Sequence, residues 1–173
     1  PNSVKSIGDF AFHDCTSLTN IFIPNSVISI GSEAFSGTSL KEINLPQSLT
    51  SIEDSAFEKC LLLYHINIPN SVTSIGSYAF SGCKSLKSIV LPLKLTSIKS
   101  YSFNNCINLN EINIPNSVTS IDEGAFYGCC SIKIVNLTFG LLSIGDCAFY
   151  DCKSITNMNF PNSILTIGYR AFQ

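Results

Sequence analysis

Apolar residues recur along this chain with a period of 23 residues. Each copy contains a segment of the form L-x-x-I-x-I, for example Leu63-x-x-Ile66-x-Ile68. The alternation of apolar and polar residues at the end of the segment predicts a short β-strand with its apolar side chains facing inward. A proline, or Thr138 in one copy, follows each segment. Proline has no N–H to donate to a ladder, so we expect it to end the strand.

Two further apolar columns have no exception in any copy. They are an isoleucine column (Ile7, Ile30, Ile52, Ile75, Ile98, Ile121, Ile144, Ile167) and a phenylalanine column (Phe12, Phe35, Phe57, Phe80, Phe103, Phe126, Phe149, Phe172). A single copy cannot bury these side chains against a backbone ordering cost of about 1–2 kcal/mol per residue. Stacked copies supply the missing wall. We therefore predict one solenoid over residues 1–173, with seven full copies and a partial eighth that stops at Gln173.

A hydroxyl column and an Ala-Phe pair mark the rest of each copy. The hydroxyl column contains Ser6, Ser29, Ser51, Ser74, Ser97, Ser120, Ser143 and Thr166. We interpret it as a turn position at which the hydroxyl bonds nearby backbone. The Ala-Phe pair and its neighbours predict a short helical turn on the outer face. A glycine column also admits Glu53, Lys99 and Asp122, so we do not expect it to need a backbone conformation reserved for glycine.

The consensus L-x-x-I-x-I-P-x-S-V-x-x-I-G-x-x-A-F-x-x-C resembles the BspA-like, or Treponema-type, leucine-rich-repeat family over essentially the whole chain. The resemblance implies a right-handed solenoid. Short parallel β-strands would line its concave face, with short 3₁₀ or helical turns and extended segments on the convex side. The family is associated with surface proteins of bacteria and anaerobic protists and with adhesion to host or matrix proteins. Serines such as Ser26 and Ser71 stand where the more common leucine-rich repeat has asparagine, so the usual asparagine ladder is in doubt.

Composition agrees with a folded binding module and excludes several classes of protein. Of the 173 residues, 45% are hydrophobic and 13% are charged, which is typical of a folded chain with a sizeable core. A net charge of -2 gives no bulk attraction to nucleic acid or anionic lipid. No apolar run approaches the roughly 18 residues of a membrane span. No signal peptide is visible, and the chain begins at Pro1 within a repeat.

The cysteines form one column and two outliers. The column contains Cys15, Cys60, Cys83, Cys106, Cys129 and Cys152. Its regular recurrence favours buried thiols in the core. Neighbouring rows about 5 Å apart leave a disulfide open, whereas zinc needs ligands that converge on a point. Cys130 and Cys147 lie outside the column, at positions expected to be more exposed. If the protein is secreted, they are the candidates for an intermolecular or irregular bridge.

The outward positions of the L-x-x-I-x-I segments are the candidate binding surface, because they vary while the inward columns do not. Their second column contains five asparagines, which we interpret as a self-satisfying amide ladder, with ligand recognition as the alternative. Exposed apolar side chains on this polar surface suit protein contact. The candidate binding residues on the concave face are Phe22, Tyr64, His65, Asn67, Val90 and Ile134. Asn136-Leu137-Thr138 is a glycosylation sequon on the same face, where a glycan would obstruct the groove.

No motif in the chain supports catalysis, a metal or a cofactor. The two histidines, His13 and His65, belong to different columns and copies, and no base accompanies the serine column. The acidic pairs Glu53/Asp54 and Asp122/Glu123 are typical of solvated turns. We find no phosphate loop, histidine metal motif or nucleophile elbow. We therefore expect no enzyme, no catalytic residue and no cofactor.

Two function classes remain open. The first is a cell-surface or secreted adhesion or recognition module that binds a host or matrix protein; the family resemblance favours it. The second is an intracellular protein-interaction scaffold that uses the same concave face. The redox state of Cys130 and Cys147 would help to separate them. Uncapped end repeats also predict end-to-end self-association or a longer array.

Overall fold

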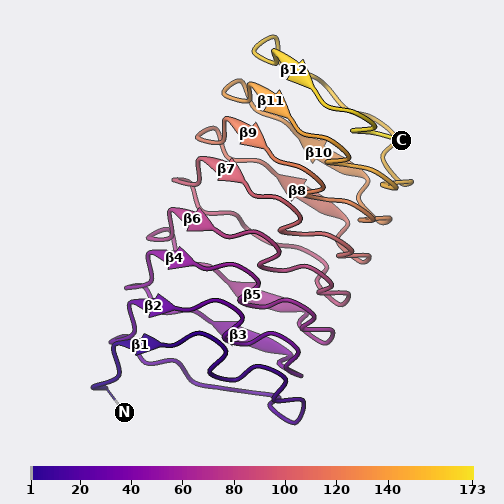
Figure 1. Cartoon of the computed structure of the whole chain (residues 1–173). Coiled ribbons are helices and arrows are strands. Elements are labelled where there is room, and N and C mark those ends of the chain that lie inside the picture. The colour runs from indigo at the N-terminus through magenta and orange to yellow at the C-terminus, as the bar shows by residue number, and fades with distance from the viewer. Residues whose placement is uncertain (1) are drawn as a thin grey trace.

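The computed structural model describes residues 2–173 as one stack of similar coils (Figure 1). Each copy contributes a two-residue strand. These are β1 (Ser6–Ile7), β2 (Ser29–Ile30), β4 (Ser51–Ile52), β6 (Ser74–Ile75), β7 (Ser97–Ile98), β9 (Ser120–Ile121), β11 (Ser143–Ile144) and β12 (Thr166–Ile167). Four copies add a three-residue strand: β3 (Glu42–Asn44), β5 (His65–Asn67), β8 (Glu111–Asn113) and β10 (Ile134–Asn136). All of the strand pairs are parallel.

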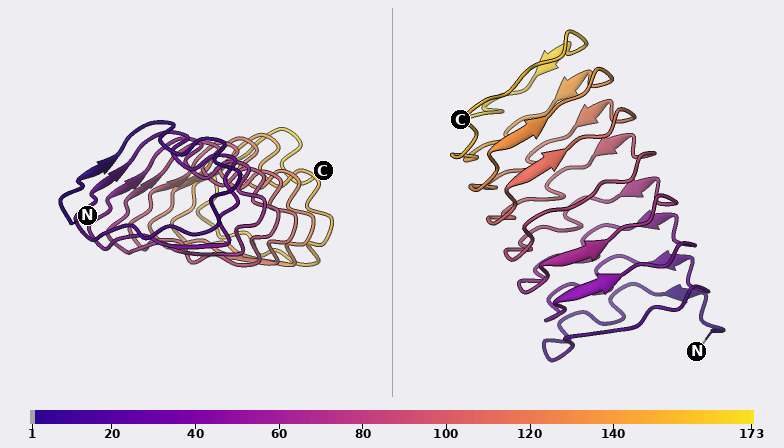
Figure 2. Two further views of the ribbon diagram at one scale, coloured as in Figure 1. Left: turned by 90° about the horizontal axis from the view of Figure 1, so that it is seen from below. Right: turned by 180° about the vertical axis from the view of Figure 1, so that it is seen from behind.

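Four of the seven L-x-x-I-x-I segments form the predicted parallel strands, which confirms the solenoid. β3 pairs with β5 so that Ile43 lies opposite Ile66, and β10 pairs with β8 so that Val135 lies opposite Ile112. Equivalent side chains of successive copies therefore form rows, as the period predicts. The view from behind in Figure 2 shows these strands on the side of the stack away from β1 and β2. The ladder is interrupted between β5 and β8, where the L-x-x-I-x-I segment of the fourth copy forms no strand.

The interpretation of the hydroxyl column as a turn position is wrong. Its serines and threonine lie in the two-residue strands, where their backbone groups belong to a second parallel ladder. Within this column, Ser51 and Ser120 donate from Oγ to the acidic side chains of Glu53 and Asp122, at 2.6 and 2.9 Å. Most of the serines that bond backbone across copies stand after the proline instead. Ser48, Ser117 and Ser163 each donate at 2.6 Å to a carbonyl of the preceding copy.

The expected helical turn is also wrong, since no residue in 2–173 is helical. The N–H groups along the Ala-Phe segment alternate between two kinds of acceptor. Phe57 donates to the Ala79 carbonyl of the next copy at 2.8 Å, whereas Glu58 donates to Ser55, three residues earlier, at 2.9 Å. Ser55 and Lys59 adopt φ angles of 54° and 56°. Left-handed residues at these points break any helix, and they leave alternate N–H groups pointing along the stack.

A row of phenylalanine rings runs through the interior. Phe57 and Phe80 stack with centroids 5.5 Å apart and an interplanar angle of 2°, and Phe80 and Phe103 follow at 5.5 Å and 10°. The rings from Phe35 to Phe149 are fully buried or nearly so. The isoleucine column is buried from Ile30 to Ile144. These two rows confirm that the invariant columns point inward.

The prediction that the cysteine column packs in the core is confirmed in the inner copies, whereas Cys152 is half-buried and Cys15 is exposed. Cys60, Cys83, Cys106 and Cys129 are fully buried. Each thiol donates to the phenylalanine carbonyl of a preceding copy; for example, Cys83 Sγ lies 3.2 Å from the oxygen of Phe57. Burial raises the pKa of the Cys60 thiol to about 11 and also raises that of Cys83. Cys130 and Cys147 are half-buried rather than exposed, and all eight cysteines are free thiols.

Candidate functional site

The six candidate binding residues lie on one side of the solenoid, which we call the LxxIxI face. This face is formed by the outward side chains of 19–22, 41–44, 64–67, 87–90, 110–113, 133–136 and 156–159. Phe22 is 86% exposed and Val90 is 82% exposed. Tyr64, His65, Asn67 and Ile134 are exposed as well. The structure thus places every candidate residue at the surface, although their role in binding stays a prediction.

The candidate residues are distributed over separate hollows rather than one groove. Phe22 lines a hollow of about 390 Å³ between the first and second copies. Val90 lines one of about 300 Å³, and Ile134 lines one of about 310 Å³. Tyr64, His65 and Asn67 lie together on or beside β5, between the hollows of Phe22 and Val90. The face therefore offers several apolar contact points along its length.

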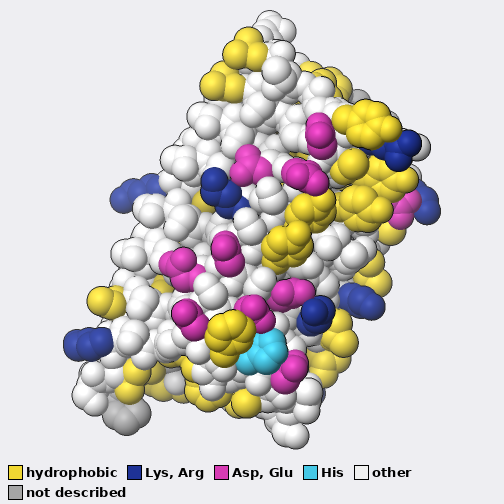
Figure 3. Space-filling model, viewed as in Figure 1, with side chains coloured by type: hydrophobic (Ala, Val, Ile, Leu, Met, Phe, Trp, Pro, Cys, Tyr) yellow, Lys and Arg dark blue, Asp and Glu magenta, His cyan; other side chains and the backbone are white. Residues whose placement is uncertain are grey.

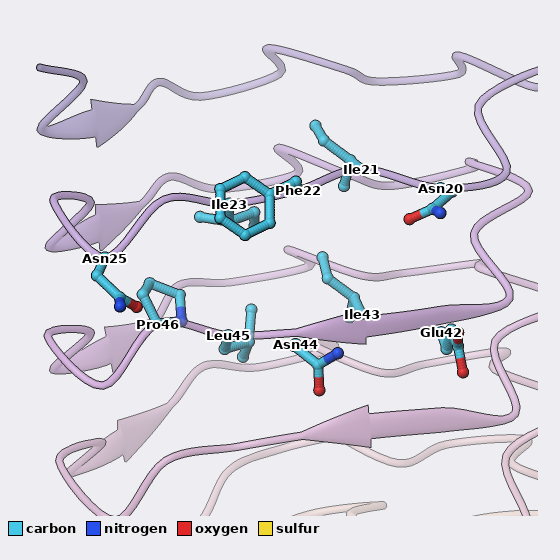
Figure 4. Close-up of a pocket in the computed structure, with 10 residues that line it drawn as sticks. All are labelled: Asn20, Ile21, Phe22, Ile23, Asn25, Glu42, Ile43, Asn44, Leu45 and Pro46. Atoms are coloured by element: carbon cyan, nitrogen blue, oxygen red, sulfur yellow. The ribbon is translucent and has the colours of Figure 1, made fainter. Parts of the chain in front are cut away.

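Figure 4 shows the hollow around Phe22. Its walls are the segment 20–23 of the first copy and the segment 42–45 of the second, and the amide-bearing side chains Asn20, Asn25 and Asn44 lie around it. The two segments approach at one end, where the Lys41 N–H donates to the Thr19 carbonyl at 3.4 Å. Beyond that point β3 has no ladder partner among the described residues of the first copy. Exposed amides beside an exposed aromatic ring can both donate and accept hydrogen bonds.

Side-chain hydrogen bonds on this face cross from copy to copy. The Tyr64 hydroxyl donates to Glu42 Oε2 at 3.2 Å, and this bond to a carboxylate raises the pKa of Tyr64. Asn136 Nδ2 donates to Asn113 Oδ1 at 2.6 Å. The predicted amide ladder therefore exists between the fifth and sixth copies. Val90 interrupts the asparagine column between Asn67 and Asn113, which limits the ladder to part of the face.

The two defining residues of the sequon, Asn136 and Thr138, differ in exposure and in hydrogen bonding. Asn136 is exposed at the end of β10, and its Nδ2 is occupied by the bond to Asn113. Thr138 is half-buried, and its hydroxyl donates to the Pro115 carbonyl at 3.2 Å. Modification of Asn136 stays a prediction.

A second group of exposed apolar side chains, which the sequence patterns did not predict, lies at the corner after the proline. Phe139 is 88% exposed, and Leu93 and Leu165 are also largely exposed. Leu93 lines the same hollow as Val90. Leu93 and Phe139 stand in a column that otherwise contains asparagine or glutamine, and this departure is the signal that could have found them.

The histidines lie on different sides of the molecule. The ring nitrogens of His13 lie 3.3 Å from a Glu33 carboxylate oxygen and 3.4 Å from one of Asp14, on the side that carries the Ala-Phe segments. Figure 3 shows acidic side chains gathered around a histidine on this side of the stack. His65 lies on β5. No group of three or more His, Cys, Asp or Glu within residues 2–173 could hold a metal ion. Over the same residues, no helix has the length and apolar character needed to cross a membrane.

Solved structures with the same architecture come from several bacteria. A leucine-rich-repeat protein of T. pallidum is 34% identical, with a TM-score of 0.84, over 89% of this chain and 72% of that protein. One from Bacteroides ovatus is 29% identical, with a TM-score of 0.68, over 100% of this chain and 68% of that one. A leucine-rich cell surface protein of Faecalibacterium prausnitzii is 28% identical, with a TM-score of 0.70, over 98% of this chain and 52% of that one.

The family comparison covers the entire repeat array. The BspA-type leucine-rich-repeat region matches residues 1–95 and 50–173, with six copies. A search of curated proteins finds no significant match. The unbroken inward rows, the parallel ladders and the match over the full length lead to one assignment. The chain belongs to the BspA-type leucine-rich-repeat family.

Proposed function

We propose that this chain is a non-catalytic protein-binding module and that its LxxIxI face contacts the partner. The observation that supports the proposal is the exposure of Phe22, Val90 and Ile134 among polar and charged side chains of the same face. Protein interfaces combine apolar contact points with a polar surround. Large exposed apolar side chains at intervals along one face fit that description better than they fit a small-molecule site.

The spacing of these side chains also favours a large partner. Phe22 belongs to the first copy and Ile134 to the sixth, so five rises of about 4.8 Å separate them by about 24 Å. A strip of that length and one strand segment wide, about 13 Å, covers only about 300 Å². A standard interface of about 800 Å² per partner would extend beyond it on both sides. The separate hollows along it are shallow. A protein that lies across several copies would engage all three side chains.

We further propose a cell-surface or secreted location and adhesion to a host or matrix protein. The F. prausnitzii relative is described as a cell surface protein, and it supports this choice. The alternative is an intracellular scaffold that uses the same face. Cys130 and Cys147 discriminate between the two, because an oxidising compartment permits a bridge between chains. Eight free thiols in protein isolated from its source without reductant would favour the scaffold.

The test uses the chain with single charge-introducing substitutions. Binding to immobilised collagen, laminin and fibronectin is measured for the wild type, Phe22→Asp and Val90→Glu. The matched control is Phe10→Asp, because Phe10 is also exposed but lies on the side of the Ala-Phe segments. We expect the two LxxIxI variants to lose at least tenfold in affinity while the control binds normally. Circular dichroism and urea midpoints check that all variants are folded.

The reverse result would overturn the assignment of the face. If Phe10→Asp abolished binding and both LxxIxI variants retained it, the partner would contact the other side. Absence of binding to all three matrix proteins would overturn adhesion to the matrix and favour the scaffold alternative.

End-to-end association remains a separate prediction. Light scattering over a range of concentrations tests it. A monomeric mass at the highest concentration would contradict it.

A further inference from the structure

A hollow of about 650 Å³ lies on the side of the Ala-Phe segments, away from the LxxIxI face. It extends over the third, fourth and fifth copies. The residues that line it are Glu58, Lys59, Leu61, Tyr78, Ser81, Gly82, Lys84, Asn104, Asn105 and Ile107. It is larger than the hollows around Phe22, Ile134 and Val90. The proposed protein-binding function does not use it.

The hollow exists because the fourth copy has small residues where its neighbours have larger ones. Ser81 and Gly82 occupy the columns that contain Glu58 and Lys59 one copy earlier, and Asn104 and Asn105 one copy later. Ser81 is buried, so these two residues form the floor. The neighbouring copies form the walls. Two rises of about 4.8 Å give the hollow a length of about 10 Å.

An aromatic ring and two aliphatic side chains supply apolar surface at the rim. The Tyr78 ring stacks on Tyr101 with centroids 5.1 Å apart and an interplanar angle of 10°, yet it remains 40% exposed. Leu61 and Ile107 are exposed on either side of the fourth copy. The stack fixes the position of the Tyr78 ring and leaves part of its surface available to a ligand. A flat apolar ligand surface could rest there without reorganisation of the chain.

The positively charged groups at the hollow outnumber the negatively charged ones. Lys59 Nζ lies 3.1 Å from Glu58 Oε1, which pairs those two charges. Lys84 forms no ion pair within residues 2–173. The lining therefore carries one excess positive charge in a chain of net charge -2. The exposed amide of Asn105 adds a hydrogen-bond donor and acceptor.

We propose that this hollow binds an acidic saccharide, a pyranose ring that carries a carboxylate or a sulfate. The C–H face of the sugar packs on the Tyr78 ring, its hydroxyls bond the Asn105 amide, and its anionic group pairs with Lys84. A wholly apolar ligand would cover the Glu58–Lys59 pair without replacing its water. A small inorganic anion would make no use of the aromatic and aliphatic rim. The combination of ring, amide and unpaired ammonium fits a ligand that is apolar on its faces and anionic at its edge.

Saturation-transfer NMR with defined oligosaccharides tests the proposal. The probes are trigalacturonate for the carboxylate, a heparin-derived tetrasaccharide for the sulfate, maltotriose as the neutral sugar and inorganic sulfate as the anion without a ring. We expect one or both acidic sugars to bind at least tenfold more tightly than maltotriose and inorganic sulfate. The two acidic probes distinguish the carboxylate from the sulfate.

Substitutions taken from other copies locate the binding without disturbing the fold. Tyr78→Ser introduces the residue of Ser55 in the same column, and Lys84→Ile introduces that of Ile107. Each should weaken binding of the acidic sugar at least tenfold. Gly82→Asn introduces the residue of Asn105 and should fill the floor with the same loss of binding. Gly82 has a φ of 73°, a left-handed angle that asparagine also adopts at Asn105, and a Cβ at Gly82 meets no atom closer than 3.6 Å. The matched control is Tyr150→Ser, which removes a stacked tyrosine outside the hollow and should leave binding unchanged.

Three results would overturn the proposal. The first is failure of both acidic probes to bind the folded wild type. The second is equal binding of maltotriose, and the third is an equal loss in Tyr150→Ser and Tyr78→Ser. Phe22→Asp should bind the acidic sugars normally, so failure of the LxxIxI face as a protein site would leave this inference intact.

Discussion

Asp54 and Gly76 are a matched pair at the junction between the third and fourth copies. Asp54 Oδ1 accepts a hydrogen bond of 2.7 Å from the N–H of Ser77, and a Cβ at Gly76 would lie only 2.4 Å from that oxygen. The same relationship joins Asp9 to Gly31 and Asp146 to Gly168. Where the aspartate position holds serine, at Ser32, Ser77 and Ser100, the next copy has Glu53, Lys99 and Asp122 instead of glycine. Crowding by the preceding copy therefore explains these three glycines.

Gly76→Ala should destabilise the protein by about 1–3 kcal/mol, because the added methyl group overpacks the junction. Asp54→Ser in the same chain should recover part of that loss, because it removes the nearest oxygen. Urea unfolding of both single variants and the double variant gives the coupling energy, which we expect to be about 0.5–3 kcal/mol. Strictly additive losses would show that the aspartate and the glycine are independent.

Ser102→Ala should stabilise the fold by about 1–2 kcal/mol. Ser102 is fully buried and its Oγ has no hydrogen-bond partner within residues 2–173, so the hydroxyl loses its water without compensation. Every other copy has alanine in this column: Ala11, Ala34, Ala56, Ala79, Ala125, Ala148 and Ala171. The free energy of unfolding in urea measures the gain. Ser88→Ala, at an exposed position, is the control and should change stability by less than about 0.5 kcal/mol.

The inward rows can be predicted from the sequence because burial imposes one residue type at a fixed period. Phe80 and Ile75 are buried for that reason. The ladder formed by the two-residue strands cannot be predicted from the sequence. A strand of two residues, such as Ser74–Ile75, is too short to show an alternating pattern. The left-handed turn also escapes prediction because most of its positive φ angles are adopted by residues other than glycine, such as Tyr78 at 58°. Glycine takes the second left-handed position in only some copies, as Gly82 does at 73°.

The candidate site is predictable in part. Outward positions such as Phe22 and Val90 follow from alternation, and both are exposed. The hollow above Ser81 and Gly82 depends on the size of neighbours that lie 23 residues away in each direction. It emerges only when the copies are stacked. The pairing of aspartate with glycine is visible when the copies are aligned. Its cause becomes clear only from the structure, which places Asp54 Oδ1 only 2.4 Å from where a Cβ at Gly76 would lie.

The buried thiols should resist modification until the protein unfolds. Cys60, Cys83, Cys106 and Cys129 lie in the core, and burial raises the pKa values of their thiols, so little reactive thiolate forms. In native protein a disulfide reagent such as DTNB should modify the exposed Cys15 first. The four buried thiols should react only after denaturant is added. Rapid modification of all eight cysteines in folded protein would contradict the packing of the column.

Tyr101 should ionise at higher pH than an ordinary tyrosine. Its hydroxyl donates to Glu123 Oε1 at 2.6 Å, and this bond, followed by partial burial and the carboxylate charge, raises the pKa of Tyr101 to about 12. Because the pKa in the folded state lies above the unfolded value of about 10, the bond contributes its full stability below about pH 10. That contribution is lost as the pH rises through about 12.

Phenolate absorbance, followed as the pH is raised, reports this ionisation among the six tyrosines. The difference between wild type and Tyr101→Phe assigns the transition of Tyr101, and circular dichroism identifies the pH range in which the chain stays folded. Glu123→Gln removes the acceptor charge, so the assigned pKa should fall toward about 10. An unchanged pKa in Glu123→Gln would mean that the burial of Tyr101, and not the carboxylate, keeps its hydroxyl protonated.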